Sequence, residues 1–292
     1  MHIKAVKHRR RSTLSKKYLT IISIFIGVIA MALLGGCQPS NNAKIKVMAG
    51  TSLVADIVEQ VGSGHVEVFD LVPPNQHPGN FDVKPDDIKK LTTAKLFLLQ
   101  GLPGETYVDK LVTAANNPNL KVIKANVPGN WMIPSIQSTA VDSVLNALIE
   151  VDPDHTVDYQ TAAVKYQQTI SEKSIQLETK LTAANVGGIK VIASSRQADF
   201  LQWAGFNIVA TFDSAASLTP QVVKDLVDKG KANGVTLVIN NLQDSEDAGK
   251  GIAASIGAKN LNLSNFPGGF SNTNTWAQAI DYNVNLLIDA IK

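Results

Sequence analysis

The sequence predicts an α/β protein built from two lobes of parallel sheet that are bridged by one long backbone helix. Apolar, strand-like runs alternate with amphipathic helical segments along residues 45–150, and the same alternation returns along residues 187–292. Strands that alternate with helices in this way are typical of parallel sheets. Between these regions, residues 151–186 hold a helical pattern whose main part, Asp154–Leu181, would run about 40 Å at 1.5 Å per residue. That length is enough to span both lobes.

In the N-terminal lobe each predicted strand is followed by a predicted helix. Residues 65–72 alternate in polarity, which favours a half-buried strand, whereas residues 95–99 are continuously apolar, as expected of a strand covered on both faces. Asp86 and Asp87 follow Pro85, so a short helix begins there with acids at its positive end. The strands expected are residues 44–48, 65–72, 95–99 and 121–124, and the helices are residues 53–61, 86–91 and 106–115.

The middle of the chain is predicted to be helical. One helix covers residues 136–149, and Asp152-Pro153-Asp154 begins a second, longer one with Asp at the N-cap and Pro at the first helical position. Apolar residues of the second helix recur on one stripe, interrupted by Ser174, and this stripe is expected to face the core. Its members are Tyr159, Ala163, Tyr166, Ile170, Leu177 and Leu181.

The C-terminal lobe repeats this order. The helix 220–233 has Thr219 at its N-cap and Gly234 directly after its last residue, which are typical start and stop signals. The strands expected are residues 189–193, 207–210, 236–239 and 259–263, and the helices are residues 197–204, 220–233, 245–256 and 275–291.

Charge is distributed unevenly along the 292 residues. Seven of the 27 Lys and Arg residues lie in positions 1–37, which hold no acid, so 20 basic and 25 acidic residues remain and give a net charge of −5. Nucleic-acid binding depends on clustered cations. A nucleic-acid partner is therefore not expected.

Residues 1–36 are predicted to be a lipoprotein signal peptide. A basic segment precedes an uncharged apolar run, residues 19–34, which is short for a membrane-spanning helix. The ending Leu34-Gly35-Gly36-Cys37 resembles the bacterial lipoprotein signal, in which the cysteine is acylated and becomes the new N-terminus. Cys37 is the only cysteine of the chain, and residues 37–44 then form a polar tether. The alternative is an uncleaved signal anchor.

A stiff loop, residues 73–85, joins the predicted strand 65–72 to the helix that follows. It contains four prolines and one glycine, and its one histidine is His77. Binding residues are common in loops held on a rigid frame. His77 is therefore a candidate metal ligand or polar contact, although loop histidines are often simply solvated.

Ser194, Ser195 and Arg196 directly follow a predicted strand and precede a helix. They should lie at the carboxyl end of a strand in an open α/β lobe, where ligands bind. Arg196 is the only arginine after residue 37, and its planar guanidinium suits a carboxylate or phosphate, with the helix N-terminus and two hydroxyls adding donors. The alternative is an ordinary surface arginine.

Two pairs of polar or aromatic residues are further candidates. Asn240 and Asn241 follow another predicted strand, and their amides suit an organic polar ligand, although an ordinary turn gives the same pattern. Trp131, after Asn130, is either the wall of a ligand cleft or a core anchor between the lobes. The sequence offers no nucleophile–base pair and no phosphate-binding glycine loop, so it does not predict an enzyme.

Seven short motifs occur in a consistent order along residues 45–291. They are Thr51–Gly62, the Val-Pro-Pro loop before Lys84-Pro85, Gly101–Glu105, Trp131 before Pro134, Asp152-Pro153, Leu218-Thr219-Pro220 and Tyr282–Leu286. None is specific alone, but in this order and spacing they resemble the zinc- and manganese-type solute-binding proteins of ABC importers. The resemblance implies a TroA-like solute-binding fold, with the ligand held between the lobes by three histidines and a carboxylate.

The positions that the resemblance assigns to those four metal ligands hold other residues here. The loop histidine falls at Gly79, with His77 two residues early, and the other three positions fall at Gly129, Ser194 and Ser264. Zinc sites need about four N, S or O donors, and manganese still needs carboxylates or histidines. The candidate ligand-binding residues are Asn130, Trp131, Ser194, Ser195, Arg196, Asn240, Asn241 and Ser264, with His77 as a candidate metal ligand.

The resemblance implies a lipid-anchored solute-binding protein on the outer face of the bacterial cytoplasmic membrane, or in the periplasm. It would pass its ligand to an ABC permease and ATPase. An anion or a metal chelate is expected rather than a bare ion, and zinc or manganese would be transported ligands, not cofactors. Two alternatives stay open: a true metal-ion binder that uses His77 and oxygen donors, and an adhesin or scaffold lipoprotein that has lost its ligand.

Overall fold

The computed structural model describes residues 43–292, so the predicted signal peptide and Cys37 lie outside the described residues. Residues 44–292 form one compact unit. Within the described part of the chain, no helix has both the length and the apolar character needed to cross a membrane.

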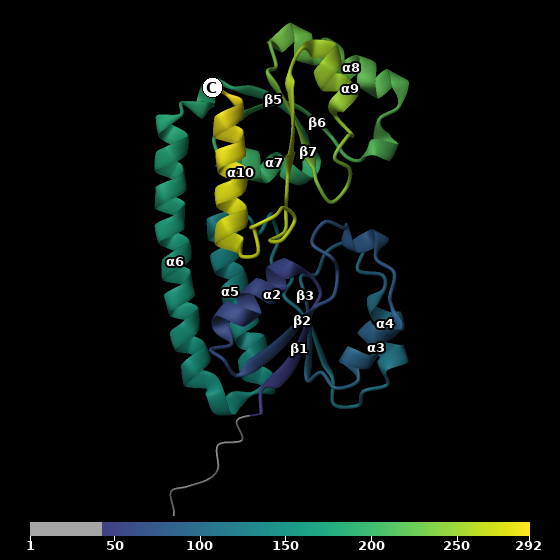
Figure 1. The fold of residues 1–292 in the computed structure, drawn as a ribbon, viewed down its shortest axis with the longest axis vertical. Coiled ribbons are helices and arrows are strands. Elements are labelled where there is room, and N and C mark those ends of the chain that lie inside the picture. Colours follow the sequence, from purple (N-terminus) through teal and green to yellow (C-terminus); the bar gives the residue numbers. More distant parts are fainter. Residues whose placement is uncertain (1–42) are drawn as a thin grey trace, which may run out of the picture. The chain divides into compact units, whose positions relative to one another are not determined.

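Two four-stranded parallel sheets organise this unit, as the sequence predicted (Figure 1). The first has the strand order β2-β1-β3-β4 and the second β6-β5-β7-β8. The strands are β1 Ile45–Ala49, β2 Val66–Asp70, β3 Leu96–Leu99, β4 Lys121–Lys124, β5 Lys190–Ser194, β6 Asn207–Phe212, β7 Leu237–Asn241 and β8 Lys259–Leu263. All eight expected strands are present, with ends that differ by a few residues.

Helices cover both faces of each sheet. They are α2 Ser52–Val61, α3 Pro85–Leu91, α4 Val108–Ala115, α5 Pro134–Val151, α6 Thr156–Ala183, α7 Ser195–Trp203, α8 Pro220–Asn233, α9 Lys250–Ile256 and α10 Trp276–Ala290. Short 3-10 turns at Pro78–Asn80 and Pro153–His155 precede α3 and α6.

The long helix α6 runs alongside both sheets and packs against α5, α2 and α10 (Figure 1). Its buried residues are the six of the predicted stripe, Tyr159 to Leu181. One apolar cluster continues from the first sheet through α2, α5 and α6 to α10 and the second sheet. The outer face of the first sheet has its own cluster under α3 and α4, and that of the second has one under α8 and α9. The two lobes therefore share their largest core.

The start of α6 differs from its prediction. Asp152 makes no side-chain capping hydrogen bond, and the helix begins at Thr156, after a 3-10 turn. Instead, the Asp152 carboxylate accepts hydrogen bonds from the Tyr159 hydroxyl and from His155 Nδ1. The Asp152 carboxylate thus bonds two side chains instead of a backbone N–H of the helix, and the capping pattern in the sequence does not reveal this.

A second difference concerns β7 and α9. β7 extends through Asn240 and Asn241, which were expected to follow the strand, and α9 begins at Lys250 instead of Ser245. The intervening residues 242–249 form turns, because the backbone N–H groups of Asp244 and Ser245 both donate to the Asn241 carbonyl. This turn segment borders the candidate site.

Candidate functional site

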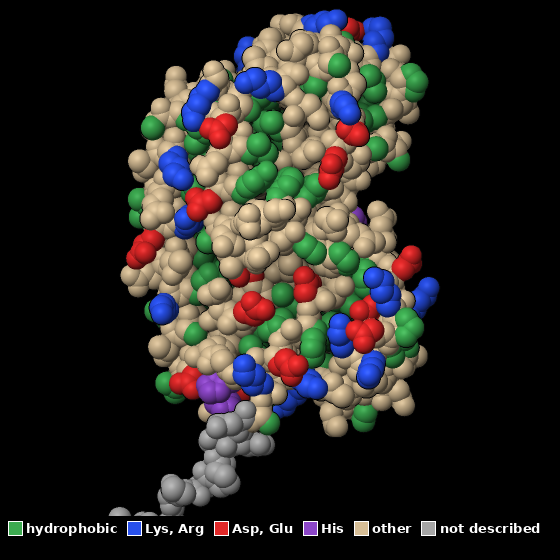
Figure 2. Space-filling view, in the orientation of Figure 1, with side chains coloured by type: hydrophobic (Ala, Val, Ile, Leu, Met, Phe, Trp, Pro, Cys, Tyr) green, Lys and Arg blue, Asp and Glu red, His purple; other side chains and the backbone are tan. Residues whose placement is uncertain are grey.

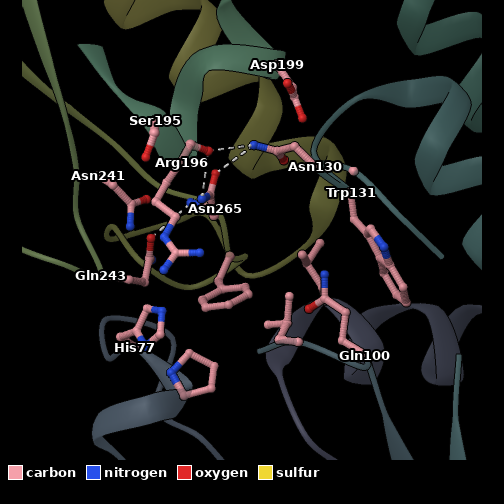
Figure 3. A pocket seen from close by; sticks show the side chains of 15 residues that line it. His77, Gln100, Asn130, Trp131, Ser195, Arg196, Asp199, Asn241, Gln243 and Asn265 are labelled. Atoms are coloured by element: carbon pink, nitrogen blue, oxygen red, sulfur yellow. Dashed lines mark hydrogen bonds between the residues drawn. The ribbon is translucent and has the colours of Figure 1, made fainter. Parts of the chain in front are cut away.

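A pocket of about 240 Å³ lies between the carboxyl ends of the central strands of the two sheets (Figure 3). In each sheet the chain order reverses between the two middle strands, β1 and β3 or β5 and β7. Ligands of open α/β sheets bind at such switch points. Here both switch points contribute to one pocket, and the space-filling surface is notched at the level between the sheets (Figure 2).

The pocket is lined by residues from both lobes. The N-terminal lobe supplies Leu53, His77, Pro78, Gln100, Leu102, Gly129, Asn130 and Trp131, and the C-terminal lobe supplies Ser195, Arg196, Asp199, Asn241, Gln243, Asn265 and Phe266. Six of the nine sequence-predicted site residues are among them, namely His77, Asn130, Trp131, Ser195, Arg196 and Asn241.

The other three predicted residues lie behind the lining and serve the framework. Ser194 is buried and caps α7 by accepting a hydrogen bond from the Arg196 N–H. The Asn240 amide bonds the backbone of Gly249 and Leu261. The Ser264 hydroxyl donates to the Phe266 carbonyl and accepts from Gln243. Their buried side chains are already satisfied by neighbours within the C-terminal lobe.

Arg196 is the main cationic group of the pocket. It lies in the first turn of α7, and its side chain extends toward His77 in the opposite lobe (Figure 3). Its Nε is 3.7 Å from Asp244 Oδ2, which is an ion-pair distance but too long for a hydrogen bond. The side chain is 48% exposed. The guanidinium therefore keeps N–H donors available for a ligand.

His77 reaches the pocket from the proline loop with a defined tautomer. Its Nδ1 accepts a hydrogen bond of 3.0 Å from the Gly79 N–H, so the proton of the neutral ring is on Nε2. Nε2 lies 3.9 Å from Asp244 Oδ1. Burial, the largest influence, lowers the pKa of His77, while Asp244 opposes that shift and Arg196 adds to it. His77 therefore presents a neutral N–H donor to the pocket.

Carboxamide side chains join the two lobes around the pocket. Asn130 Nδ2, from the N-terminal lobe, donates to Asn265 Oδ1 at 2.9 Å and to the Arg196 carbonyl at 3.3 Å (Figure 3). Gln243 Nε2 crosses in the other direction to the Pro74 carbonyl at 2.7 Å. These bonds fix the walls relative to each other.

Trp131 borders the pocket and is also buried in the core. Its ring lines the pocket but is 1% exposed. Its indole N–H donates to the Val127 carbonyl, and its own carbonyl accepts from the Trp276 indole across the lobes. It is a core anchor whose edge forms part of the wall.

Five polar residues at the pocket were not singled out from the sequence. Gln100, Gln243 and Asn265 lie one or two residues after β3, β7 and β8, so the rule used for Arg196 would have found them. Asp199 lies one turn beyond Ser195 on α7. Asp244 lies in the turn segment after β7, where no periodic pattern marks it.

Comparisons with known proteins place the chain in a family. Residues 47–290 match the family described as ZnuA, zinc-uptake complex component A, periplasmic. The chain belongs to this family. Members of the ZnuA family are substrate-binding components of metal uptake by ABC transporters and are not enzymes.

Individual relatives of the ZnuA family are distant in sequence but extend over most of the chain. The iron-binding protein YfeA of Yersinia pestis is 24% identical over 260 residues, covering 82% of this chain and 84% of its own. The manganese ABC transporter substrate-binding lipoprotein PsaA of Streptococcus pneumoniae is 22% identical over 244 residues, covering 73% and 78%.

Solved structures confirm the fold. A crystal structure of ZnuA superimposes with a TM-score of 0.74 at 22% identity, covering 85% of this chain and all of that one. The periplasmic zinc-binding protein TroA of Treponema pallidum gives 0.73 at 16% identity, covering 85% and 99%. The TroA-like arrangement of two parallel sheets and a long helix is thereby shown.

The structure also locates the four positions that the resemblance assigned to metal ligands. Gly129 lines the pocket with φ +97°, and Ser194 and Ser264 are buried behind it. A Cβ at Gly79 would lie 3.0 Å from His77 Nδ1. Among residues 43–292, no group of three or more His, Cys, Asp or Glu side chains is arranged to hold a metal ion. The pocket instead offers amides, one guanidinium, one imidazole N–H and the carboxylates of Asp199 and Asp244.

Proposed function

We propose that this protein is the lipid-anchored, extracytoplasmic solute-binding component of an ABC importer, and that its cargo is an anion or an anion-bearing metal chelate. Membership of the ZnuA family supports the transport role. Several relatives are named as lipoproteins, and Leu34-Gly35-Gly36-Cys37 supports the same anchor here. An ABC permease and ATPase are the partners that this role requires.

The observation that carries the choice of cargo is the set of donors in the pocket. Arg196 and His77 Nε2 offer N–H groups from opposite lobes, and neither makes a hydrogen bond of ordinary length through these groups within residues 43–292. Guanidinium and imidazole N–H groups bind carboxylate and phosphate oxygens well. A metal would therefore be carried with its organic ligand, whose oxygens the protein contacts.

A second candidate is direct binding of a bare divalent ion between His77 and Asp244. Their Nε2 and Oδ1 atoms are 3.9 Å apart, which is too long for a hydrogen bond but short enough to be bridged by one ion. Two features count against it. Metal-binding histidines usually donate their other N–H to an acceptor, whereas Nδ1 of His77 accepts from Gly79. Arg196 also competes for the same carboxylate.

The test is a thermal-shift screen of the purified protein against Zn²⁺, Mn²⁺, small carboxylates and metal chelates, followed by calorimetry on hits. A ligand at a hundred times its Kd should stabilise the protein by about 2.7 kcal/mol. For a chain of this size that is a rise in Tm of about 5–11 °C. Shifts by bare ions alone would favour the second candidate, and no shift by any compound would favour a scaffold role.

Arg196→Ala provides the decisive variant. It should abolish binding of the hit while leaving the Tm of the free protein nearly unchanged, because the side chain is half exposed. Lys250→Ala is the matched control, since Lys250 is an exposed cation of the same lobe that pairs with Asp247. Unaltered affinity in Arg196→Ala would refute the anion-binding proposal.

A further inference from the structure

Asp244 is a second charged group at the pocket, close to both candidate donors. Its carboxylate lies between the two candidate donors, 3.7 Å from Arg196 Nε and 3.9 Å from His77 Nε2. Asn241 Nδ2 donates to its Oδ2 at 3.1 Å and holds it in place. Asp244 remains 15% exposed, so a ligand in the pocket can contact it.

The charges of the site do not suit a simple anion. Arg196 is the one cation among the lining residues, whereas two carboxylates belong to the site, Asp199 in the lining and Asp244 at 3.7 Å from Arg196 Nε. His77 adds no charge, because its Nδ1 accepts a hydrogen bond from the Gly79 N–H, and burial lowers its pKa in the same sense. A dicarboxylate bound to Arg196 and His77 would bring its negative charge close to Asp244, and like charges at such distances repel strongly in a half-buried site. The ligand therefore needs a positive centre next to its anionic group.

The size of the pocket and the type of its other groups agree with a small ligand of that kind. The volume of about 240 Å³ is below the roughly 300–1,000 Å³ of sites for drug-sized molecules. Three amide side chains border the same space. Those of Asn241 and Gln243 are bonded within the protein. The Gln100 amide makes one hydrogen bond within residues 43–292, which its oxygen accepts from the Thr51 hydroxyl. Amides donate and accept hydrogen bonds without adding charge, so they suit a ligand whose charges are already balanced.

We propose that the pocket binds a zwitterionic ligand of the amino-acid type, either free or as the organic part of a metal chelate. Its carboxylate lies against Arg196 and His77 Nε2, and its positive centre, an ammonium group or the chelated metal, faces Asp244. Asp244 is thus the residue that distinguishes such ligands from simple anions. This inference rests on the proposed function and specifies the class of its cargo.

The experiment compares four proteins, the wild type, Asp244→Asn, Arg196→Ala and the control Asp247→Asn. Asparagine at 244 keeps an oxygen that can accept from Asn241, so the turn should persist. Asp247 is 72% exposed and pairs with Lys250, away from the pocket. The probes are the common amino acids alone, the same amino acids with equimolar Zn²⁺, succinate, and Zn²⁺ alone, each measured by thermal shift and then by calorimetry.

The wild type should bind at least one amino acid, or its zinc complex, more tightly than succinate. Asp244→Asn should weaken that binding at least tenfold and strengthen binding of succinate, and Asp247→Asn should change neither. The arms with and without Zn²⁺ tell whether the free amino acid or the chelate is the better ligand.

Four results would overturn the inference. The first is equal affinity of the wild type and Asp244→Asn for the amino-acid probe. The second is a wild type that binds succinate more tightly than any amino-acid probe and loses that binding in Arg196→Ala. This result would agree with the proposed function but contradict a zwitterionic ligand. The third is tight binding of Zn²⁺ alone that Asp244→Asn abolishes, which would make Asp244 a metal ligand. A wild type that binds no probe of either kind would refute the inference and the proposed function together.

Discussion

Replacement of Tyr166 by phenylalanine tests the junction of the two lobes. The Tyr166 hydroxyl, on α6, donates to Asp56 Oδ2 on α2 at 2.8 Å and accepts from Gln137 Nε2 on α5 at 3.3 Å. The same Asp56 oxygen accepts from the Trp276 backbone N–H at the start of α10. Tyr166 is 7% exposed and Asp56 4%. One carboxylate thus connects three helices from both parts of the fold.

The expected cost follows from the hydrogen bond that is lost. A bond from a neutral donor to a charged acceptor contributes about 1.5–3 kcal/mol, and phenylalanine leaves no cavity beyond the missing hydroxyl. We expect Tyr166→Phe to lower the free energy of unfolding by about 2 kcal/mol at neutral pH. In a chain of this size that corresponds to a fall in Tm of about 4–8 °C.

The cost should also depend on pH, with a defined sign. Burial is the largest influence on Asp56 and raises its pKa, despite the hydrogen bonds from Trp276 and Tyr166 that lower it. The folded state therefore binds the proton more readily than the unfolded state, and folding gains stability as pH falls through the folded pKa toward 3.8. Below the folded pKa the bond from Tyr166 reaches a neutral acid. The cost of the substitution should then shrink to about 1 kcal/mol.

Urea denaturation at several pH values from about 4 to about 8 provides the measurement. Tyr282→Phe is the control, because Tyr282 is 40% exposed and its ring stacks on Phe270. It should change the free energy of unfolding by less than about 0.5 kcal/mol. A cost for Tyr166→Phe below that value, or a cost that does not change with pH, would contradict this prediction.

Three further predictions concern other parts of the chain. Gly129→Ala should cost about 1–2 kcal/mol in chemical denaturation, because φ is +97° and the new Cβ would lie 2.5 Å from Ile136 Cδ1; unchanged stability would show that the loop adapts. Burial raises the pKa of Asp152, but the hydrogen bonds from Tyr159 and His155 outweigh it and hold that pKa below 3.8. The stability that Asp152 contributes is present above pH 3.8 and is lost as pH falls through its folded-state pKa. Asp152→Asn should therefore reduce the loss of unfolding free energy at acid pH, and an unreduced loss would contradict this prediction. Cys37→Ser should move the protein from the membrane fraction to the soluble fraction on fractionation, whereas retention in the membrane would favour an uncleaved signal anchor.

The strands and the long helix were predictable because their signals are periodic. Buried positions of α6 follow the 3.6-residue repeat closely enough that all six stripe residues were identified in advance. The same reasoning was incomplete at the end of β7. Neighbouring strand residues point to opposite faces, so only one of Asn240 and Asn241 can reach the pocket. Asn241 lines the pocket, and choosing it over Asn240 required knowing that β7 continues through both residues.

The site was predictable where it follows from the backbone and unpredictable where it depends on loops. Arg196 was found because strand carboxyl ends converge at one edge. The same rule selected Ser194, and the family resemblance selected Ser264, but their short side chains turn back to cap a helix and a loop. Asp244 was missed, because its position depends on the turns between β7 and α9 and on contacts with residues far away in sequence.

The core shared by the two lobes limits how occupancy of the pocket can be communicated. The apolar cluster runs without interruption from β1 to α10, and bending the lobes apart would expose it to water. A transport partner that must distinguish loaded from empty protein therefore cannot rely on a change in the angle between the lobes. We expect the difference to be read from the rim of the pocket, where His77 of the proline loop lies 3.9 Å from Asp244 in the turn after β7. Fluorescent labels on that rim should report ligand, whereas labels at the far ends of the lobes should not.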